Sequence, residues 1–253
     1  GIIIGVAAVI STLALGAGSQ EKIIADINSM GTNTIEIYPG TGFGDLEAWS
    51  KNSLSIDDVM VLNRQPFLVR GSPVVIHTGL VSSRFHNATG QAYGVNEQYF
   101  HAKGLTLRQG RLFSESDIHN MASVVVIDKE GAEAFFSNID PVGQFLLFED
   151  KPLQIIGVVE SKNRVGGSGA LLVWTPYTVV IYKLSGVKHL NSIVVQVGDR
   201  ENSQIAEKII TEILTTLHGG QKDFFILNVD SLRRTVESAT DTLRILIFGI
   251  AFI

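Results

Sequence analysis

Residues 192–229 read SIVVQVGDRENSQIAEKIITEILTTLHGGQKDFFILNV and carry the pattern that decides the fold. The β-branched run 192–197 predicts a strand, and 224–229 predicts another. Between them, residues 203–217 repeat apolar side chains at helical spacing, which predicts an amphipathic helix. We expect its buried face to carry Ile205, Ile209, Ile213 and Leu217. The whole stretch is therefore predicted to be a β-α-β unit.

A second unit of the same kind lies near the start of the chain. Residues 34–38, TIEIY, alternate apolar and polar side chains as a strand does. Ser55 is placed to cap a short helix that ends at Leu62, and residues 67–81 supply a second strand. The Gly-rich stretch 40–53 is expected to be irregular.

A long insertion, residues 97–188, separates the two units. It has predicted strands at 123–128, 153–159 and 171–174 and a short helix around 130–136. The pattern predicts an α+β fold with two lobes, in which a split module of two β-α-β units is interrupted by a mixed lobe.

Both ends of the sequence are uncharged and apolar. Residues 1–15 read GIIIGVAAVISTLAL and residues 245–253 read ILIFGIAFI. Each run is shorter than the approximately 20 residues that span a bilayer. We expect the first run to be the end of one transmembrane helix and the second to be the start of another. A cleaved signal peptide, which would need a basic leading segment, and a pair of buried soluble helices are the alternatives.

The segments next to these runs carry further helical patterns. Ile23, Ile24 and Ile27 share one helical face in the N-terminal segment, and Gly31 is expected to end that helix. Leu232, Val236 and Ala239 form a stripe near the C-terminus, where Asp230 or Ser231 is the expected N-cap. The pattern predicts two long stalk helices, packed on each other or on a second copy of the chain.

The composition gives no support to nucleic-acid binding or to catalysis. Twenty-five acidic residues against twenty basic ones give a formal charge of −5, whereas nucleic-acid binding needs a concentrated basic surface. GTGFG at 40–44 and GGSG at 166–169 lack the Lys-Ser or Lys-Thr of a phosphate loop, and no His pair has metal-ligand spacing. We predict no catalytic, cofactor-binding or metal-binding residue. Phe43 and Trp49, in the Gly-rich stretch, are candidates for partner contact or for packing over the sheet.

Three stretches resemble a known family. Residues 11–40, STLALGAGSQEKIIADINSMGTNTIEIYPG, are similar to the membrane-exit segment of MacB-type ABC transporter permeases. GRLFSESD at 110–117 and DPVGQFLL at 140–147 resemble the extracytoplasmic insertion of that family, and SLRRTVESATDTLRILIFGIAFI at 231–253 resembles its entry into the second span.

The resemblance implies that the parent protein lies in the bacterial inner membrane and that most of this chain forms a two-lobed domain in the periplasm. ATP and Mg²⁺ would be bound only by an ATPase domain elsewhere in the parent protein. The parent would be a homodimer that couples to a MacA-like periplasmic adaptor and a TolC-like outer-membrane channel. It would relay ATP-driven motion to the periplasm and expel macrolides, peptides or similar substrates. The resemblance also implies an organisation in five segments. Residues 1–31 would be the end of the first transmembrane helix with its stalk, and residues 231–253 the second stalk with the start of the next transmembrane helix. Between them, residues 32–96 and 189–230 would form the two parts of a porter-like lobe, and residues 97–188 an inserted, Sabre-like lobe.

Other classes share this outline. A lipoprotein-releasing or adaptor-free permease has the same order of segments, and a two-span sensor has a similar extracytoplasmic domain between its helices. A membrane-tethered hydrolase is the enzyme alternative, and the missing pairs of nucleophile and base count against it.

Overall fold

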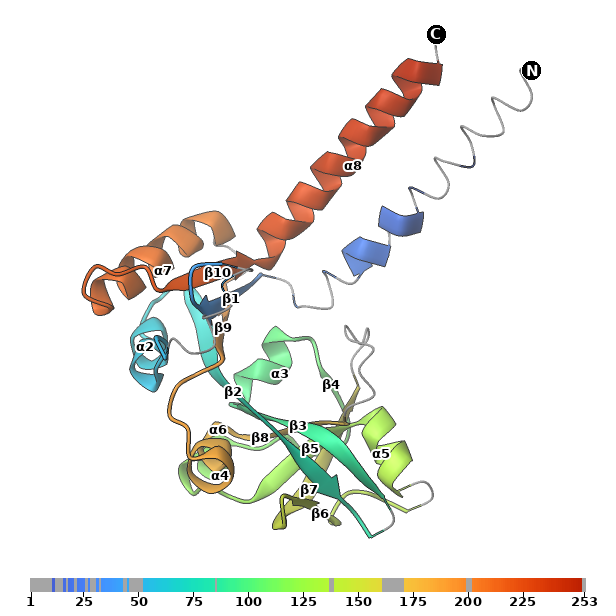
Figure 1. Cartoon of the computed structure of the whole chain (residues 1–253), viewed down its shortest axis with the longest axis vertical. Coiled ribbons are helices and arrows are strands. Elements are labelled where there is room, and N and C mark those ends of the chain that lie inside the picture. The colour runs from blue at the N-terminus through green and yellow to red at the C-terminus, as the bar shows by residue number, and fades with distance from the viewer. Residues whose placement is uncertain are drawn as a thin grey trace.

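The computed structural model describes residues 11, 16, 18–20, 22–25, 27, 31, 33–42, 45, 52–84, 86–136, 139–160, 171–198 and 202–251, with the backbone alone at 70, 243, 244 and 246–251. Within these residues the strands follow the order β10-β1-β9-β2-β3-β8-β5-β7-β4, and β6 pairs with both β2 and β7. The first four strands in this order form one half of the molecule. The others form the second half, and β2 runs through both (Figure 1).

The first half contains both predicted β-α-β units, interleaved in one antiparallel sheet. β1 lies between β9 and β10, and β9 lies between β1 and β2. The helices α2 and α7 lie on one side of this sheet (Figure 1). The element bounds are β1 Thr34–Pro39, α2 Ile56–Leu62, β2 Leu68–Ser82, β9 Ser192–Val197, α7 Ser203–Leu217 and β10 Phe224–Asn228.

The second half is a mixed sheet that closes on itself. β3 pairs with the end of β2 and in parallel with β8, while the short strand β6 connects β7 back to β2. The elements are β3 Asn87–Val95, α3 Gln98–Ala102, β4 Thr106–Gly110, α4 Glu115–His119, β5 Val124–Asp128, α5 Lys129–Phe136, β6 Phe145–Phe148, β7 Lys151–Glu160, β8 Leu171–Pro176, α6 Tyr177–Val179 and the π-helix η2 Val180–Ser185. The lobe boundaries at 96/97 and 188/189 remain a prediction. They assign β3 to the first lobe, although it pairs with β8.

A continuous apolar core joins the two halves. One buried cluster includes Ile35 and Ile37 of β1 together with Val125 and Ile127 of β5. Because apolar burial stabilises the folded state roughly in proportion to the area removed from water, this shared core holds the halves together.

The predicted bounds of α7 are correct, but its predicted buried face is only partly so: Ile209 and Ile213 are half-buried, and Ile213 packs against the core. Ile205 is 58% exposed and Leu217 is also exposed, whereas Ala206, Ile210 and Leu214 are buried. The helix carries two rows of apolar residues at i, i+4 spacing, and periodicity alone does not rank them. The row that faces the core begins with the small side chain of Ala206.

α8 (Val229–Ala251) begins directly after β10, and neither predicted N-cap is correct. The cap is Asn228, whose side-chain oxygen accepts hydrogen bonds from the backbone N–H of Asp230 at 3.1 Å and of Ser231 at 3.2 Å. Strand and helix therefore meet without a loop. At 1.5 Å per residue, α8 is about 35 Å long, and it extends away from the sheets (Figure 1).

The described residues between 11 and 27 are helical, and their ribbon lies at the same end of the molecule as α8 (Figure 1). Across the part of the chain that the structure describes, no helix combines the length and the apolar character needed to cross a membrane.

Candidate functional site

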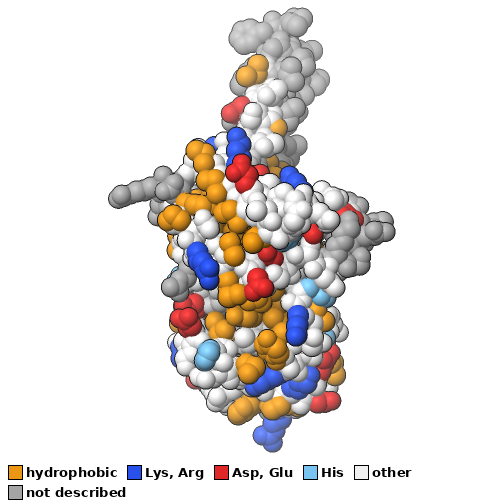
Figure 2. Space-filling model, turned by 90° about the vertical axis from the view of Figure 1, so that its left-hand side faces the viewer, with side chains coloured by type: hydrophobic (Ala, Val, Ile, Leu, Met, Phe, Trp, Pro, Cys, Tyr) orange, Lys and Arg blue, Asp and Glu red, His pale blue; other side chains and the backbone are white. Residues whose placement is uncertain are grey.

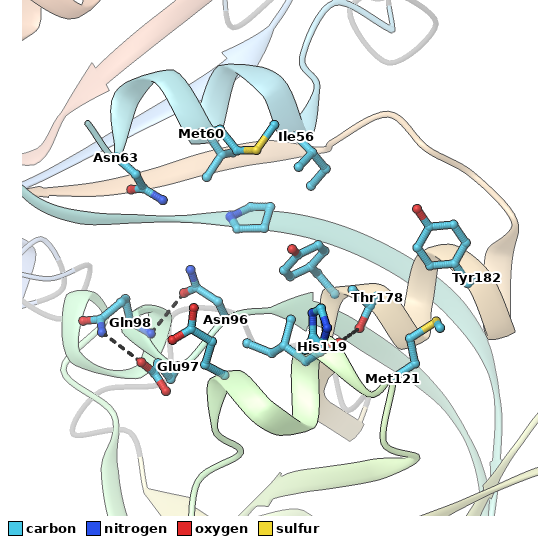
Figure 3. Close-up of a pocket in the computed structure, with 15 residues that line it drawn as sticks. Ile56, Met60, Asn63, Asn96, Glu97, Gln98, His119, Met121, Thr178 and Tyr182 are labelled. Atoms are coloured by element: carbon cyan, nitrogen blue, oxygen red, sulfur yellow. Dashed lines mark hydrogen bonds between the residues drawn. The ribbon is translucent and has the colours of Figure 1, made fainter. Parts of the chain in front are cut away.

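A groove of about 500 Å³ lies between the two halves. α2 of the first half forms one wall, and α4 and α6 with the start of η2 form the opposite wall (Figure 3). Side chains of both walls point toward the space between them (Figure 3). We call this space, lined most prominently by Ile56, Met60, Glu97, Glu115, Met121 and Tyr182, the inter-lobe groove.

The wall formed by α2 is positioned by the N-terminal cap and the buried face of this helix. The Ser55 side chain accepts the backbone N–H of Asp58, whose carboxylate accepts the N–H of Ser55 at 2.8 Å in return. Val59 and Leu62 are in the core. Met60 and Ile56, four residues apart, lie on one face of the helix and are directed into the groove (Figure 3).

The opposite wall, formed by α4, α6 and the start of η2, is positioned in the same way. Ser114 and Asp117 form a second capping box at the start of α4. The Arg111 guanidinium donates to the Asp117 carboxylate at 2.7 Å, and this hydrogen bond is the main reason that the pKa of Asp117 falls to about 2. Ile118 is buried, and its carbonyl accepts the Thr178 hydroxyl at 2.7 Å, which ties α4 to α6.

The groove combines apolar side chains with negative charge. Glu97 and Glu115 are its carboxylates, and no Lys or Arg is among its described lining residues. Asn96 is held by its own bonds, since its amide donates to the Gly71 carbonyl at 2.9 Å and its backbone N–H donates to Ser72 at 3.0 Å. The groove therefore combines apolar side chains from both walls with the fixed amide of Asn96 and two carboxylates.

A buried group of polar side chains, Glu36, Tyr38 and Lys103, joins the halves on another side of the molecule. Glu36 of β1 accepts the Lys103 ammonium and the Tyr38 hydroxyl, both at 2.5 Å. The side chains of Lys103 and Glu36 are only 17% and 4% exposed. Burial first, and then the neighbouring Glu36 charge, raise the pKa of Tyr38 well above its usual value. Tyr38 is therefore a hydrogen-bond donor at all physiological pH values.

A second buried polar cluster surrounds His218, at the end of α7. Its Nδ1 lies 2.5 Å from Asp223, and its Nε2 lies 3.3 Å from Asp58 of α2. Burial alone would lower the pKa of His218, but the hydrogen bond to Asp223 and the charges of both carboxylates outweigh it and raise the pKa. The cluster joins α7 to the capping box of α2.

The stalk residues predicted from the sequence have different degrees of burial. Ile27 is buried, Ile24, Leu232 and Val236 are half-buried, and Ile23 and Ala239 are exposed. Their assignment to stalk packing remains a prediction. Phe43 and Trp49, predicted to contact a partner, lie outside the described residues.

The groove residues were not singled out from the sequence. They come from segments between residues 56 and 182, and no local motif connects them. The available signal was Met60, an apolar residue on the side of α2 away from Val59 and Leu62. Among the described residues, no three His, Asp or Glu side chains gather as a metal site would require.

Comparisons with known proteins decide the family. The family model that describes the MacB-like periplasmic core domain matches residues 1–213 of the sequence. The chain belongs to the MacB-like periplasmic core domain family.

Individual members of the MacB family agree with this assignment. The chain is 45% identical, over all of its length, to the macrolide export ATP-binding/permease protein MacB of Neisseria meningitidis serogroup A, and it spans 39% of that protein. It is also 45% identical over 249 residues to the MacB protein of Pectobacterium atrosepticum, covering 96% of the chain and 38% of that protein.

Solved structures confirm the fold. The crystal structure of the periplasmic region of MacB from Actinobacillus actinomycetemcomitans matches with a TM-score of 0.75 and 37% identity, over 85% of this chain and 98% of that one. The extracellular domain of the ABC-type transporter YknZ from Gram-positive bacteria has the same fold, with a TM-score of 0.64 at 19% identity over 78% of this chain and all of that one. The chain is thus a mixed α/β domain of the MacB periplasmic type.

Proposed function

We propose that the chain is the periplasmic relay domain of a MacB-type exporter in the bacterial inner membrane. An ATPase domain in another part of the parent protein supplies the motion, with ATP and Mg²⁺ bound there. Two copies form a homodimer, which docks a MacA-like adaptor and, through it, a TolC-like channel. The substrates are macrolides, peptides or similar molecules. The match to MacB proteins along the entire chain carries this proposal.

The junction of α8 with the sheet supports a relay. Asn228 caps α8, and its side-chain amide donates to the Ser203 carbonyl at 3.1 Å and to Glu207 at 3.0 Å, both on α7. A displacement of α8 is therefore passed to β10 and to α7 without a flexible connection. A hydrogen-bonded helix of this length transmits such a displacement along its axis.

The stalk residues give the relay its proposed contact between copies. Val236 is half-buried and Ala239 is exposed on α8, and neither lies in the described core clusters. We assign them, with Leu232, Ile23, Ile24 and Ile27, to packing between the stalks of the homodimer.

An inter-copy disulfide tests the relay. The sequence contains no cysteine, so Val236→Cys in the parent transporter adds a single thiol to each copy of this domain. Oxidation should join the two stalks and stop macrolide export, and reduction should restore it. Glu130→Cys, at an exposed position on α5, is the matched control and should not respond. Normal export by a fully cross-linked V236C transporter would contradict the relay.

A further inference from the structure

We propose that His218 is a protonation-dependent clamp on α2, so that the mobility of one wall of the inter-lobe groove follows the pH around the domain. The inference goes beyond the proposed function, because it concerns how this wall is held and requires neither export nor a second copy. It rests on the positions of His218, Asp58 and Asp223.

Both ring nitrogens of His218 face a carboxylate. Nδ1 lies 2.5 Å from Asp223, and Nε2 lies 3.3 Å from Asp58. An ionised carboxylate only accepts hydrogen bonds, and a histidine ring has two N–H donors only when it is protonated. The arrangement therefore satisfies both carboxylates only with the imidazolium form of His218.

The surroundings of the ring favour this form. Asp58 faces it from α2, and Asp223 faces it from the segment that leads into β10, whose Phe224 ring lies edge-on at a centroid distance of 5.6 Å. Lys222, next to Asp223 in the chain, is exposed. Burial alone would lower the pKa of His218, but the hydrogen bond to Asp223 and the two negative charges raise it above its ordinary value of about 6.5.

Loss of the proton releases α2 rather than Asp223. A neutral ring keeps one N–H, and the shorter contact, with Asp223, retains it on Nδ1. Nε2 then presents a lone pair to the Asp58 carboxylate. The side chains of His218 and Asp58 are only 9% and 6% exposed, so water screens little of this change from attraction to repulsion.

α2 is short enough to depend on this clamp. It has seven residues, and helices of this length are marginal without tertiary contacts. Val59 and Leu62 hold it to the core. At its N-terminal end Asp58 serves two contacts, because one carboxylate oxygen accepts the backbone N–H of Ser55 and the other faces His218. Deprotonation of His218 therefore loosens the first turn of α2.

The groove side of α2 does little to hold the helix in place. Figure 2 views the molecule from the side that carries α2 and α7, and hydrophobic side chains form a band down this face. On α2, Met60 is 49% exposed and Ile56 is half-buried, although both are apolar. Because apolar side chains stabilise packing in proportion to the area that they bury, the contact with His218 carries a correspondingly larger share.

The test is an NMR titration of the 253-residue chain in a neutral detergent between about pH 5.5 and pH 9.5, a range that includes the ordinary histidine pKa. With ¹³C-methyl methionine, the Met60 signal, assigned with M60L, should shift with the same midpoint as the His218 ring, assigned with H218Q. In H218Q the Met60 signal should not respond to pH. A Met60 signal that is independent of pH in wild type, or that titrates equally in H218Q, would overturn the proposal.

Two other histidines near α2 provide matched controls. His119 lines the groove, and His189 precedes Leu190, whose N–H donates to the Leu54 carbonyl at 3.0 Å. H119Q and H189Q should leave the Met60 midpoint unchanged, and loss of the Met60 titration in either variant would overturn the proposal by assigning the effect to that ring.

A variant of the closer carboxylate tests the charge dependence. D223N keeps a side chain of the same size but removes its charge, so the Met60 midpoint should move to lower pH. An unchanged midpoint in D223N would overturn the clamp.

Hydrogen exchange measures the loosening itself. The amides of α2, corrected for the intrinsic pH dependence of exchange, should lose about tenfold in protection as the pH rises through the His218 midpoint, as expected when one charge-assisted hydrogen bond is lost. The amides of α5, in the other half of the molecule, are the internal control and should change less than about twofold. Equal protection of α2 on both sides of the midpoint would overturn the proposal.

Discussion

Lys103→Met should destabilise the chain strongly, because it removes one partner of the buried ion pair that joins the two halves. Lys103 Nζ lies 2.5 Å from Glu36, and the two side chains are 17% and 4% exposed. Removing one partner of a buried pair leaves an uncompensated charge and costs about 3 kcal/mol or more. That is a loss of about two orders of magnitude in the folding equilibrium constant.

The second partner provides the matched variant. Glu36→Gln combined with Lys103→Met removes both charges and keeps a side-chain acceptor for the Tyr38 hydroxyl. The double variant should therefore recover most of the lost stability, to within about 1 kcal/mol of wild type. The control is Lys129→Met, which breaks two long pairs of an exposed lysine, with Glu133 and with Glu160, each at 3.9 Å, and should cost less than about 0.5 kcal/mol.

The assay is urea unfolding of the full chain, followed by far-UV circular dichroism. We expect a large loss of unfolding free energy for K103M, a small loss for the double variant and almost none for K129M. A K103M variant as stable as K129M would refute the claim that this pair fastens the halves, as would a double variant no more stable than K103M.

Three further predictions concern stability. Because the pKa of His218 is raised on folding, its contribution to folding stability is fully present below pH about 6.5 and is lost as the pH rises through the pKa of the folded state. In urea unfolding, wild type should therefore lose more stability than H218Q between pH 6 and pH 8. Parallel curves of stability against pH would contradict this. Gly31→Ala should cost at least about 2 kcal/mol, since Gly31 has φ +102° and a β-carbon would lie 1.9 Å from the Ala102 carbonyl oxygen; an unchanged melting temperature would contradict it. Ile210→Ala, at a fully buried position, should cost about 2–5 kcal/mol, whereas Ile205→Ala should cost less than about 0.5 kcal/mol; equal losses in urea would contradict the observed orientation of α7.

The sequence predicts the elements of the first half because each has a strong local signal. The strand Ser192–Val197 and the helix Ser203–Leu217 have the predicted bounds, and α2 begins after the predicted cap at Ser55. The face of α7 was not predictable, since two rows of apolar residues compete and only the sheet selects between them. Likewise, Asn228 outcompetes Asp230 as the cap of α8 because the preceding strand ends at that residue.

The second half is less predictable for physical reasons. β3, with the sequence NATGQAYGV, has few residues that favour strands and is held by its neighbours β2 and β8. β6 has four residues, and its place depends on pairing with two distant strands. The groove is harder still, because Met60, Glu97, Glu115 and Tyr182 meet only once both halves are assembled.

The most direct test of the relay is the distance between the two copies at the stalk. Spin labels on Val236→Cys in the parent transporter would give this distance by pulsed electron paramagnetic resonance, without nucleotide and with ATP bound to an ATPase-inactive form. If ATP binding draws the two stalks together, the distance should be resolvably shorter with ATP. An identical distance distribution in the two states would contradict the relay.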